Sequence, residues 1–256
     1  MSEHRGRRLV SHVLVRVDDV AGAVGAAGDA GFSVGWGSDP ADAHNALIHF
    51  HDGPFIELFD PVPSGRLGRI LGPPVGALSR VLRRGDVGRF AGWVSARGPC
   101  DWALEIETAL ADEVESLEAD GIEIGRVREV DRTPPDRPTS TWSVVAPKDP
   151  SLPFVMDPYD PPLLIDDGLR SHPCGVERIT AIELTDPEPT EHARVLGRYL
   201  DASVESVDGG GWSIDDGRCA VIVRHGAEHG IVGLRIAGPS TPLSPLFGLP
   251  LLPALG

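Results

Sequence analysis

Three segments of the chain repeat one plan, and this repetition constrains the fold more than any other feature. Each segment starts with a β-rich run, passes through acidic residues into a helix rich in Ala, Glu or Leu, and stops at Gly or Asp. The β-rich runs are residues 9–17, 90–96 and 176–184. Further strand-like runs follow each helix, so each unit is predicted to be βαβββ or close to it. We therefore expect an α+β fold built from repeated βαβββ modules.

An acidic residue stands near the start of each predicted helix, where its carboxylate can accept hydrogen bonds from free backbone N–H groups. These residues are Asp18 and Asp19 in the first unit, Asp101 in the second and Asp186 in the third. The second helix is expected to follow Asp101 and to end near Asp120. Its apolar face is formed by Ile106, Leu110, Val114 and Leu117.

The repeats divide the chain into five predicted parts. These are a first βαβββ module at 1–61, a basic insert at 62–88, a second module at 89–170, a third βαβββ-like unit at 171–237 and a Pro/Leu-rich C-terminal arm at 238–256. The insert is a crossover covering a sheet edge or a lid that attracts an anionic ligand. The arm either packs as an extended segment or mediates self-association as a homodimer.

Charge and composition exclude several classes of function. The formal net charge is −15, so the chain repels polyphosphate and nucleic acid is not an expected partner. No run approaches the ~18–20 apolar residues that cross a bilayer, so no membrane partner is expected. Three widely spaced cysteines give no disulfide framework, which favours a reducing cytoplasm. Without a phosphate-cradling glycine loop, no nucleotide cofactor is expected.

The best candidates for chemistry are His12 and Glu57. Side chains alternate between the two faces of a strand. In the first strand, Val13, Val15 and Val17 are expected beneath the helix, and the opposite face carries Val10, His12, Leu14 and Arg16. Glu57 shares a face with Phe55 and Phe59, where a carboxylate is costly unless it meets a cation, a metal or a donor. Imidazole and carboxylate bind Zn, Fe, Mn or Ni; the alternative is a hydrogen-bonded core pair.

Several short motifs, in a fixed order and spacing, carry a family resemblance. They are residues 11–19, 30–32, 44–48, 52–58, 154–157 and 171–175. With them the chain resembles the glyoxalase-like domain of the vicinal oxygen chelate superfamily over most of residues 9–185. The resemblance implies paired βαβββ modules whose curled, mixed β-sheets enclose a cleft, with the third unit as an addition. In metal-dependent members, the first and last strands of each module supply the ligands.

Transferred through these motifs, the resemblance implies that His12 and Glu57 bind a divalent metal, with Glu57 also catalytic. The second module departs from this pattern. Met156 stands at the place that matches Glu57, and residues 90–96 contain no His. Three donors are the usual minimum for a catalytic metal. The candidates for further ligands are His44, His49, Asp157 and His172.

Three functions remain open from the sequence. The first is a metal-dependent lyase, isomerase or dioxygenase acting on a small molecule. The second is a metal-free protein that binds or sequesters a small molecule, and the third is a structural or oligomerisation role. The predicted substrate contacts are Arg16 for an anionic group, together with Asn45, Phe55, Trp93 and Met156.

Overall fold

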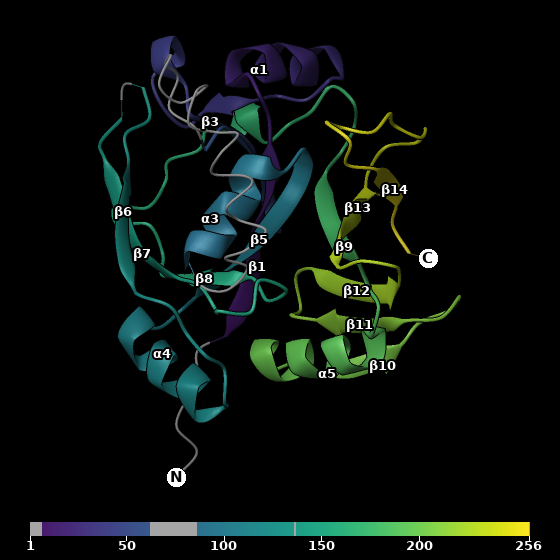
Figure 1. Cartoon of the computed structure of the whole chain (residues 1–256). Helices are drawn as coiled ribbons and strands as arrows, with labels where there is room; N and C mark the ends of the chain where they lie inside the picture. Colours follow the sequence, from purple (N-terminus) through teal and green to yellow (C-terminus); the bar gives the residue numbers. More distant parts are fainter. Residues whose placement is uncertain (1–6, 62–85, 136, 256) are drawn as a thin grey trace.

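Two β-sheets form the fold in the computed structural model, which describes residues 7–61, 86–135 and 137–255 (Figure 1). The larger sheet has eight strands in the order β2-β3-β4-β1-β5-β8-β7-β6, and the smaller has six in the order β10-β11-β12-β9-β13-β14. Both are curled, mixed sheets, as the vicinal oxygen chelate fold requires. Of the predicted insert, residues 62–85 lie outside the described residues.

The eight-stranded sheet consists of two βαβββ modules joined through their first strands. Its strands are β1 (Arg8–Arg16), β2 (Gly35–Trp36), β3 (Asn45–Ile48), β4 (Phe55–Phe59), β5 (Gly98–Ile106), β6 (Arg128–Arg132), β7 (Ser140–Val145) and β8 (Phe154–Met156). The helices of this part are α1 (Val20–Asp29), α3 (Asp86–Ser95) and α4 (Leu110–Ala119), with short 3-10 turns η1 (Pro40–Asp42) and η2 (Asp167–Leu169). β1 pairs antiparallel with β5, and each pairs in parallel with the last strand of its own module, β4 or β8.

The first elements of the six-stranded sheet along the chain belong to the predicted third unit. Its elements are β9 (Arg178–Asp186), α5 (Pro189–Leu200), β10 (Val204–Ser206), β11 (Trp212–Asp215), β12 (Ala220–His225), β13 (Gly230–Ala237) and β14 (Leu251–Pro253). β13 pairs antiparallel with β9, as β5 pairs with β1, and β14 pairs in parallel with β13, as β8 pairs with β5. The sheet therefore repeats the first six positions of the larger one. The stretch 238–256, expected to be an extended arm, supplies its edge strand.

The start of the second module differs from the prediction. Of residues 90–96, expected to be its first strand, residues 90–95 lie in helix α3 and Ala96 follows it, and the strand is β5. The predicted helix after Asp101 begins only at Leu110, and Asp101 does not cap it. Trp102 and Leu104 of β5 are buried in the core on one face while Ala103 faces the other way. This alternation is the strand pattern, which the helix-like spacing of Ile106 and Leu110 concealed.

A β-bulge in β1 corrects a second expectation. The pairing with β5 shifts register between Val10 and His12, so Ser11 is the extra residue. Because a bulge interrupts the alternation of faces, Val10 joins Val13 in the main core, although it was expected on the face of His12. His12 and Leu14 keep their predicted orientation, away from α1.

The two sheets share one core through their helix-covered faces. Arg8 of β1 is buried, forms an ion pair with Glu113 of α4 and donates to the Tyr199 carbonyl of α5. The Tyr199 hydroxyl donates to the Pro153 carbonyl at 2.9 Å. These bonds fix the six-stranded sheet against the back of the larger one and leave the opposite face of β1 free to line a cleft. Within the described ranges, no helix is long and apolar enough to cross a bilayer.

Candidate functional site

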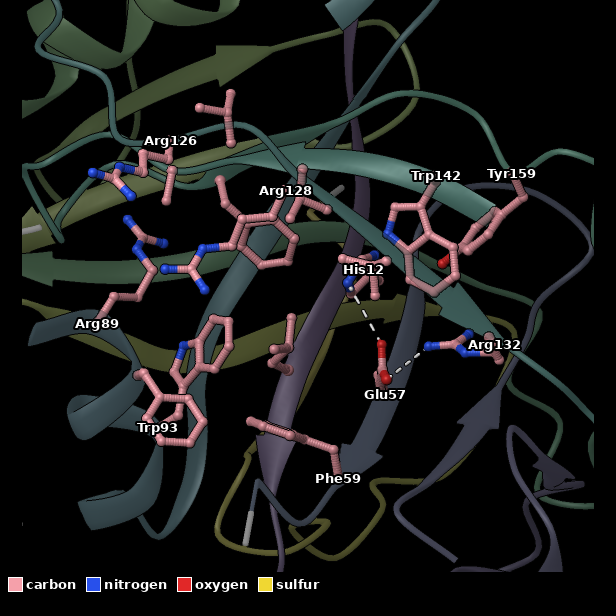
Figure 2. Close-up of a pocket in the computed structure, with 17 residues that line it drawn as sticks. His12, Glu57, Phe59, Arg89, Trp93, Arg126, Arg128, Arg132, Trp142 and Tyr159 are labelled. Atoms are coloured by element: carbon pink, nitrogen blue, oxygen red, sulfur yellow. Dashed lines mark hydrogen bonds and ion pairs between the residues drawn. The ribbon is translucent and has the colours of Figure 1, made fainter. Parts of the chain in front are cut away.

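His12 and Glu57 face each other from neighbouring strands, β1 and β4. The His12 Nε2 atom lies 3.6 Å from Glu57 Oε2 (Figure 2). The imidazole stacks on Phe55 with ring centroids 4.7 Å apart and meets the edge of Phe154 at 5.6 Å. Its Nδ1 atom is 3.2 Å from Ser11 Oγ. The rings on both sides hold the imidazole in one orientation, with one nitrogen toward the carboxylate.

Glu57 is held most firmly by Arg132, which comes from the other module. Arg132 Nη2 donates to Glu57 Oε1 at 2.8 Å, and Asn45 Nδ2 donates to the same oxygen at 2.8 Å. The Arg132 guanidinium also lies over the rings of Trp142 and Tyr159, at 5.4 and 5.8 Å from their centroids. A cation thus meets the Glu57 carboxylate, and that cation is a guanidinium.

Burial sets the protonation states of this group. Desolvation lowers the pKa of His12 to about 4, although the Glu57 carboxylate acts in the opposite direction. Burial alone would raise the pKa of Glu57, but Arg132, His12 and the Asn45 amide together hold it below its usual value. Burial and Arg132 lower the pKa of nearby His49 to about 3. At neutral pH the group therefore combines a carboxylate and a guanidinium with two neutral imidazoles.

The cleft above His12 and Glu57 has a volume of 490 Å³ and mostly apolar walls. Trp93 meets Phe59 and Phe154 edge to face, with ring centroids 5.9 and 6.1 Å apart. Among the residues that the structure describes, four arginines and one carboxylate, Glu57, line it. The arginines are Arg89, Arg126, Arg128 and Arg132 (Figure 2). Arginine is therefore concentrated at this cleft in a chain of formal net charge −15, although Arg132 binds Glu57 and Arg89 binds Asp101.

The arginines have different structural roles. Arg89 of α3 is buried and binds Asp101 of β5 through both carboxylate oxygens, at 2.9 and 2.8 Å. Trp93 Nε1 donates to the same carboxylate at 2.7 Å, so Asp101 docks α3 onto the sheet. Arg126 and Arg128, which are exposed, lie at the cleft near β6. Arg132 lines both this cleft and a second cavity of 520 Å³.

The predicted substrate contacts are dispersed. Asn45 binds Glu57, Phe55 stacks on His12, and Trp93 lines the cleft, although from a helix instead of a strand. Met156 is fully buried and does not line the cleft. Arg16 forms an ion pair with Asp18 beside a shallow pocket near α1, away from the cleft.

The structure keeps the other predicted metal ligands away from His12. His44 is exposed and lies 3.7 Å from Asp42. His172 is buried between loops: its Nδ1 accepts from Ser33 N at 3.0 Å, and its Nε2 lies 2.9 Å from the His49 carbonyl. Asp157 accepts a hydrogen bond from Ser143 N in β7. His49 lies nearer, because it contacts Phe55 with ring centroids 4.7 Å apart, as His12 does, but it lines the second cavity.

The donor set around His12 does not fit a divalent metal. Ala103 pairs with Phe154 as His12 pairs with Phe55, so Ala103 and buried Met156 stand where the second module would supply its ligands. In the part of the chain that the structure describes, neither His12 nor Glu57 belongs to a cluster of three converging His, Cys, Asp or Glu ligand atoms. One Glu57 oxygen already binds Arg132. Two donors fall short of the three that catalytic sites provide.

Arg126, Arg128, Arg132 and Tyr159 were missed by the sequence analysis. A signal for the arginines exists, because residues 126, 128, 130 and 132 read Arg, Arg, Val and Arg with period two. Such spacing places side chains on one face of a strand. Tyr159 lies in a loop after β8, and no local pattern indicates that it reaches Arg132.

Comparisons with known proteins agree on the fold. A family model described as "Glyoxalase-like domain" matches residues 10–200. A hypothetical protein from Staphylococcus aureus is 10% identical, with a TM-score of 0.64 over 94% of this chain and 97% of that chain. No curated protein sequence matches the chain.

Two solved enzymes share the fold with similarly low sequence identity. The Mn(II)-bound glyoxalase from Novosphingobium aromaticivorans is 12% identical, with a TM-score of 0.52 over 90% of this chain and 66% of that chain. A variant of homoprotocatechuate 2,3-dioxygenase from B. fuscum is 11% identical, with a TM-score of 0.52 over 92% of this chain and 58% of that chain. Such identities show the fold alone. Because the family model spans both modules of the larger sheet, the chain belongs to the glyoxalase-like domain family of the vicinal oxygen chelate superfamily.

Proposed function

We propose that the cleft binds a small organic anion with a flat apolar part, without a metal at His12 and Glu57. The observation that carries this proposal is that three guanidinium groups, those of Arg126, Arg128 and Arg132, line a cleft with mostly apolar walls, where Arg132 already binds the carboxylate of Glu57. Guanidinium groups hydrogen-bond carboxylates and phosphates through a planar pair of donors. In a chain of net charge −15, such a concentration of arginine attracts an anion locally.

The aromatic walls favour a flat ligand. Phe59, Trp93 and Phe154 present faces and edges at centroid distances suited to a further ring. The volume of 490 Å³ lies within the ~300–1,000 Å³ typical of small-molecule sites. At the base, neutral His12 offers a hydrogen bond to a polar substituent. Arg132 is held in place by Glu57 and so does not need to reorganise when the ligand binds.

Metal-dependent chemistry at His12 is the competing function. The likeness to the Mn(II)-bound glyoxalase favours it, and the arginine bound to Glu57 opposes it. The two functions differ in what His12→Ala changes. If no metal binds at His12, the His12→Ala variant has the same metal content as the unchanged chain. If a metal binds there, the variant loses it.

Calorimetric titration of the full chain tests the proposal with matched ligands. The probes are benzoate and phenylacetate, each compared with its neutral amide. Charge-assisted hydrogen bonds contribute about 1.5–3 kcal/mol and neutral ones about 0.5–1.5 kcal/mol, so each carboxylate is expected to bind roughly 10-fold more tightly than its amide. The double variant Arg126→Gln/Arg128→Gln should abolish that preference.

Arg97→Gln is the matched control, because Arg97 is an exposed arginine paired with Asp18 outside the cleft. It should leave the preference unchanged. Equal affinity for carboxylate and amide would refute an anion site, and a preference that the double variant leaves at full strength would refute the part given to Arg126 and Arg128. A stoichiometric metal that His12→Ala removes would instead establish the metal-dependent function.

A further inference from the structure

A second group of titratable side chains lies in the six-stranded sheet, away from the cleft. His192 Nδ1 is 2.8 Å from Asp186 Oδ2, and His229 Nδ1 is 3.1 Å from the same oxygen. The two imidazole centroids are 4.8 Å apart. One ligand atom from each residue lies within 4.8 Å of the others. In the portion of the chain that the structure describes, this is the one such cluster of His, Cys, Asp or Glu.

Three separate elements bring these side chains together. Asp186 ends β9, His192 lies in the first turns of α5, and His229 is in the loop between β12 and β13. α5 packs against β9 and β12, which pair with each other. A cluster that depends on three elements is set by the tertiary fold and not by a local turn.

The loop that carries His229 is fixed to β9 on both sides of the cluster. Gly226 N donates to the Asp186 carbonyl at 3.0 Å, and Thr185 Oγ1 donates to the Glu228 carbonyl at 3.0 Å. A Cβ atom at Gly226 would stand 2.5 Å from Thr185 Cβ, so only glycine lets the loop come this close. The second oxygen of Asp186 accepts from Glu188 N at 2.8 Å, which orients the carboxylate.

One buried nitrogen in the cluster has no partner. His192 is 7% exposed, and within the described residues its Nε2 atom makes no hydrogen bond. An imidazole buried only to bond Asp186 would leave this second nitrogen uncompensated, which is costly. The bond to Asp186 therefore satisfies one nitrogen of His192 and leaves the other, Nε2, without a partner among the described residues.

We infer that Asp186, His192 and His229 form a binding site for a divalent transition metal such as Zn²⁺. Two imidazoles and one carboxylate are a usual donor set for this ion. At metal–ligand distances of ~2.0–2.2 Å, tetrahedral geometry separates neighbouring ligand atoms by roughly 3.3 Å. The two Nδ1 atoms lie 2.8 and 3.1 Å from Asp186 Oδ2, close to this separation. The three ligand atoms as a set lie within 4.8 Å of one another, so the two imidazoles would move closer together by up to ~1.5 Å on binding.

The site has the form of an open metal centre. Three protein donors leave a fourth position, and the side chain of His229 is 30% exposed, so that position faces solvent. The ion would also connect β9, α5 and the β12–β13 loop. Metal binding should therefore raise the thermal stability of the chain as well as occupy the site.

The test uses the full chain without a histidine tag, stripped with EDTA, dialysed and titrated with Zn²⁺ in a calorimeter. We expect one equivalent to bind and the melting temperature to rise. His229→Ala should weaken binding more than ~100-fold. Because His229 is partly exposed, this variant is expected to fold normally, and circular dichroism checks that it does.

Two controls separate this site from other histidines. His44→Ala removes an exposed histidine beside Asp42 and should leave Zn²⁺ binding intact, as should His12→Ala. Asp186→Asn should reduce binding like His229→Ala. The inference fails if no saturable binding is found, or if His44→Ala lowers the affinity as much as His229→Ala. Loss of binding in His12→Ala would place the metal in the cleft instead, contradicting both this inference and the proposed function.

Discussion

The two sheets share one topology over six strands but differ in the residues on the face away from the helix. On the face away from its helix, the larger sheet has a cleft lined by His12, Glu57 and aromatic rings. On the equivalent face of the smaller sheet, Glu183 of β9 is 3% exposed and pairs with Arg224 at 3.3 Å and with Arg235. These ion pairs occupy that face of the smaller sheet, whereas the larger sheet has its cleft there.

The difference comes from the strands that the smaller sheet lacks. β14 ends the smaller sheet at the position of β8, so it has no counterparts of β7 and β6. Those two strands carry Trp142, Arg128 and Arg132 in the larger sheet. The repeated βαβββ plan therefore provides a curled surface, and the last two strands turn that surface into a cleft.

The largest expected effect comes from removing β14 with a chain that ends at residue 238. The truncation removes three buried leucines, Leu246, Leu249 and Leu251. Burial of each contributes about 1.5–3 kcal/mol, so the loss is roughly 5–9 kcal/mol, comparable to the ~5–15 kcal/mol stability of a whole domain. Urea denaturation and the soluble fraction measure it. A chain ending at residue 254 loses only exposed Leu255 and residue 256 and is the control; equal stability of the two chains would show that β14 does not complete the sheet.

A smaller loss of stability is expected when one arginine partner of a buried carboxylate is removed, and it should be greater for Glu57 than for Glu183. Arg132→Met leaves Glu57 without its guanidinium, and breaking a buried pair from one side costs about 3–5 kcal/mol. Arg235→Met leaves Arg224 on Glu183, so we expect a loss of about 1–3 kcal/mol. Urea denaturation at pH 7 compares them. Combining Arg132→Met with Glu57→Gln should recover part of the loss, and losses of equal size in the two sheets would contradict this account.

The smallest expected effect is on how the stability of the chain changes at acid pH. Burial lowers the pKa of His12 from 6.5 to about 4, so between these values the unfolded chain binds a proton that the folded chain excludes. The stability that neutral His12 provides is therefore complete above pH 6.5 and is lost as the pH falls towards 4, at up to about 1.4 kcal/mol per pH unit. His12→Asn should reduce the slope of unfolding free energy between pH 6.5 and 5.5 by up to one proton. Exposed His44→Asn is the control, and an unchanged slope in His12→Asn would mean that His12 is already protonated in the fold.

Local patterns predicted part of this molecule well. The third unit, β9 with α5, lies where the sequence placed it, and so does the shared orientation of His12 and Glu57. Residues 90–96 were mistaken for a strand because their apolar content suits either structure. The bond between Arg132 and Glu57 joins residues 75 positions apart. Its existence depends on how the sheet curls, which no local pattern specifies.

Arg132 lines two cavities, and this position has a further consequence. It lines both the 490 Å³ cleft and the 520 Å³ cavity that contains Trp36 and His49. Under the proposed function, the length of this one side chain would be one limit on the size of the ligand. With Glu57 neutralised, a shorter residue at position 132 would join the two chambers, and ligand selectivity would change in size as well as in charge.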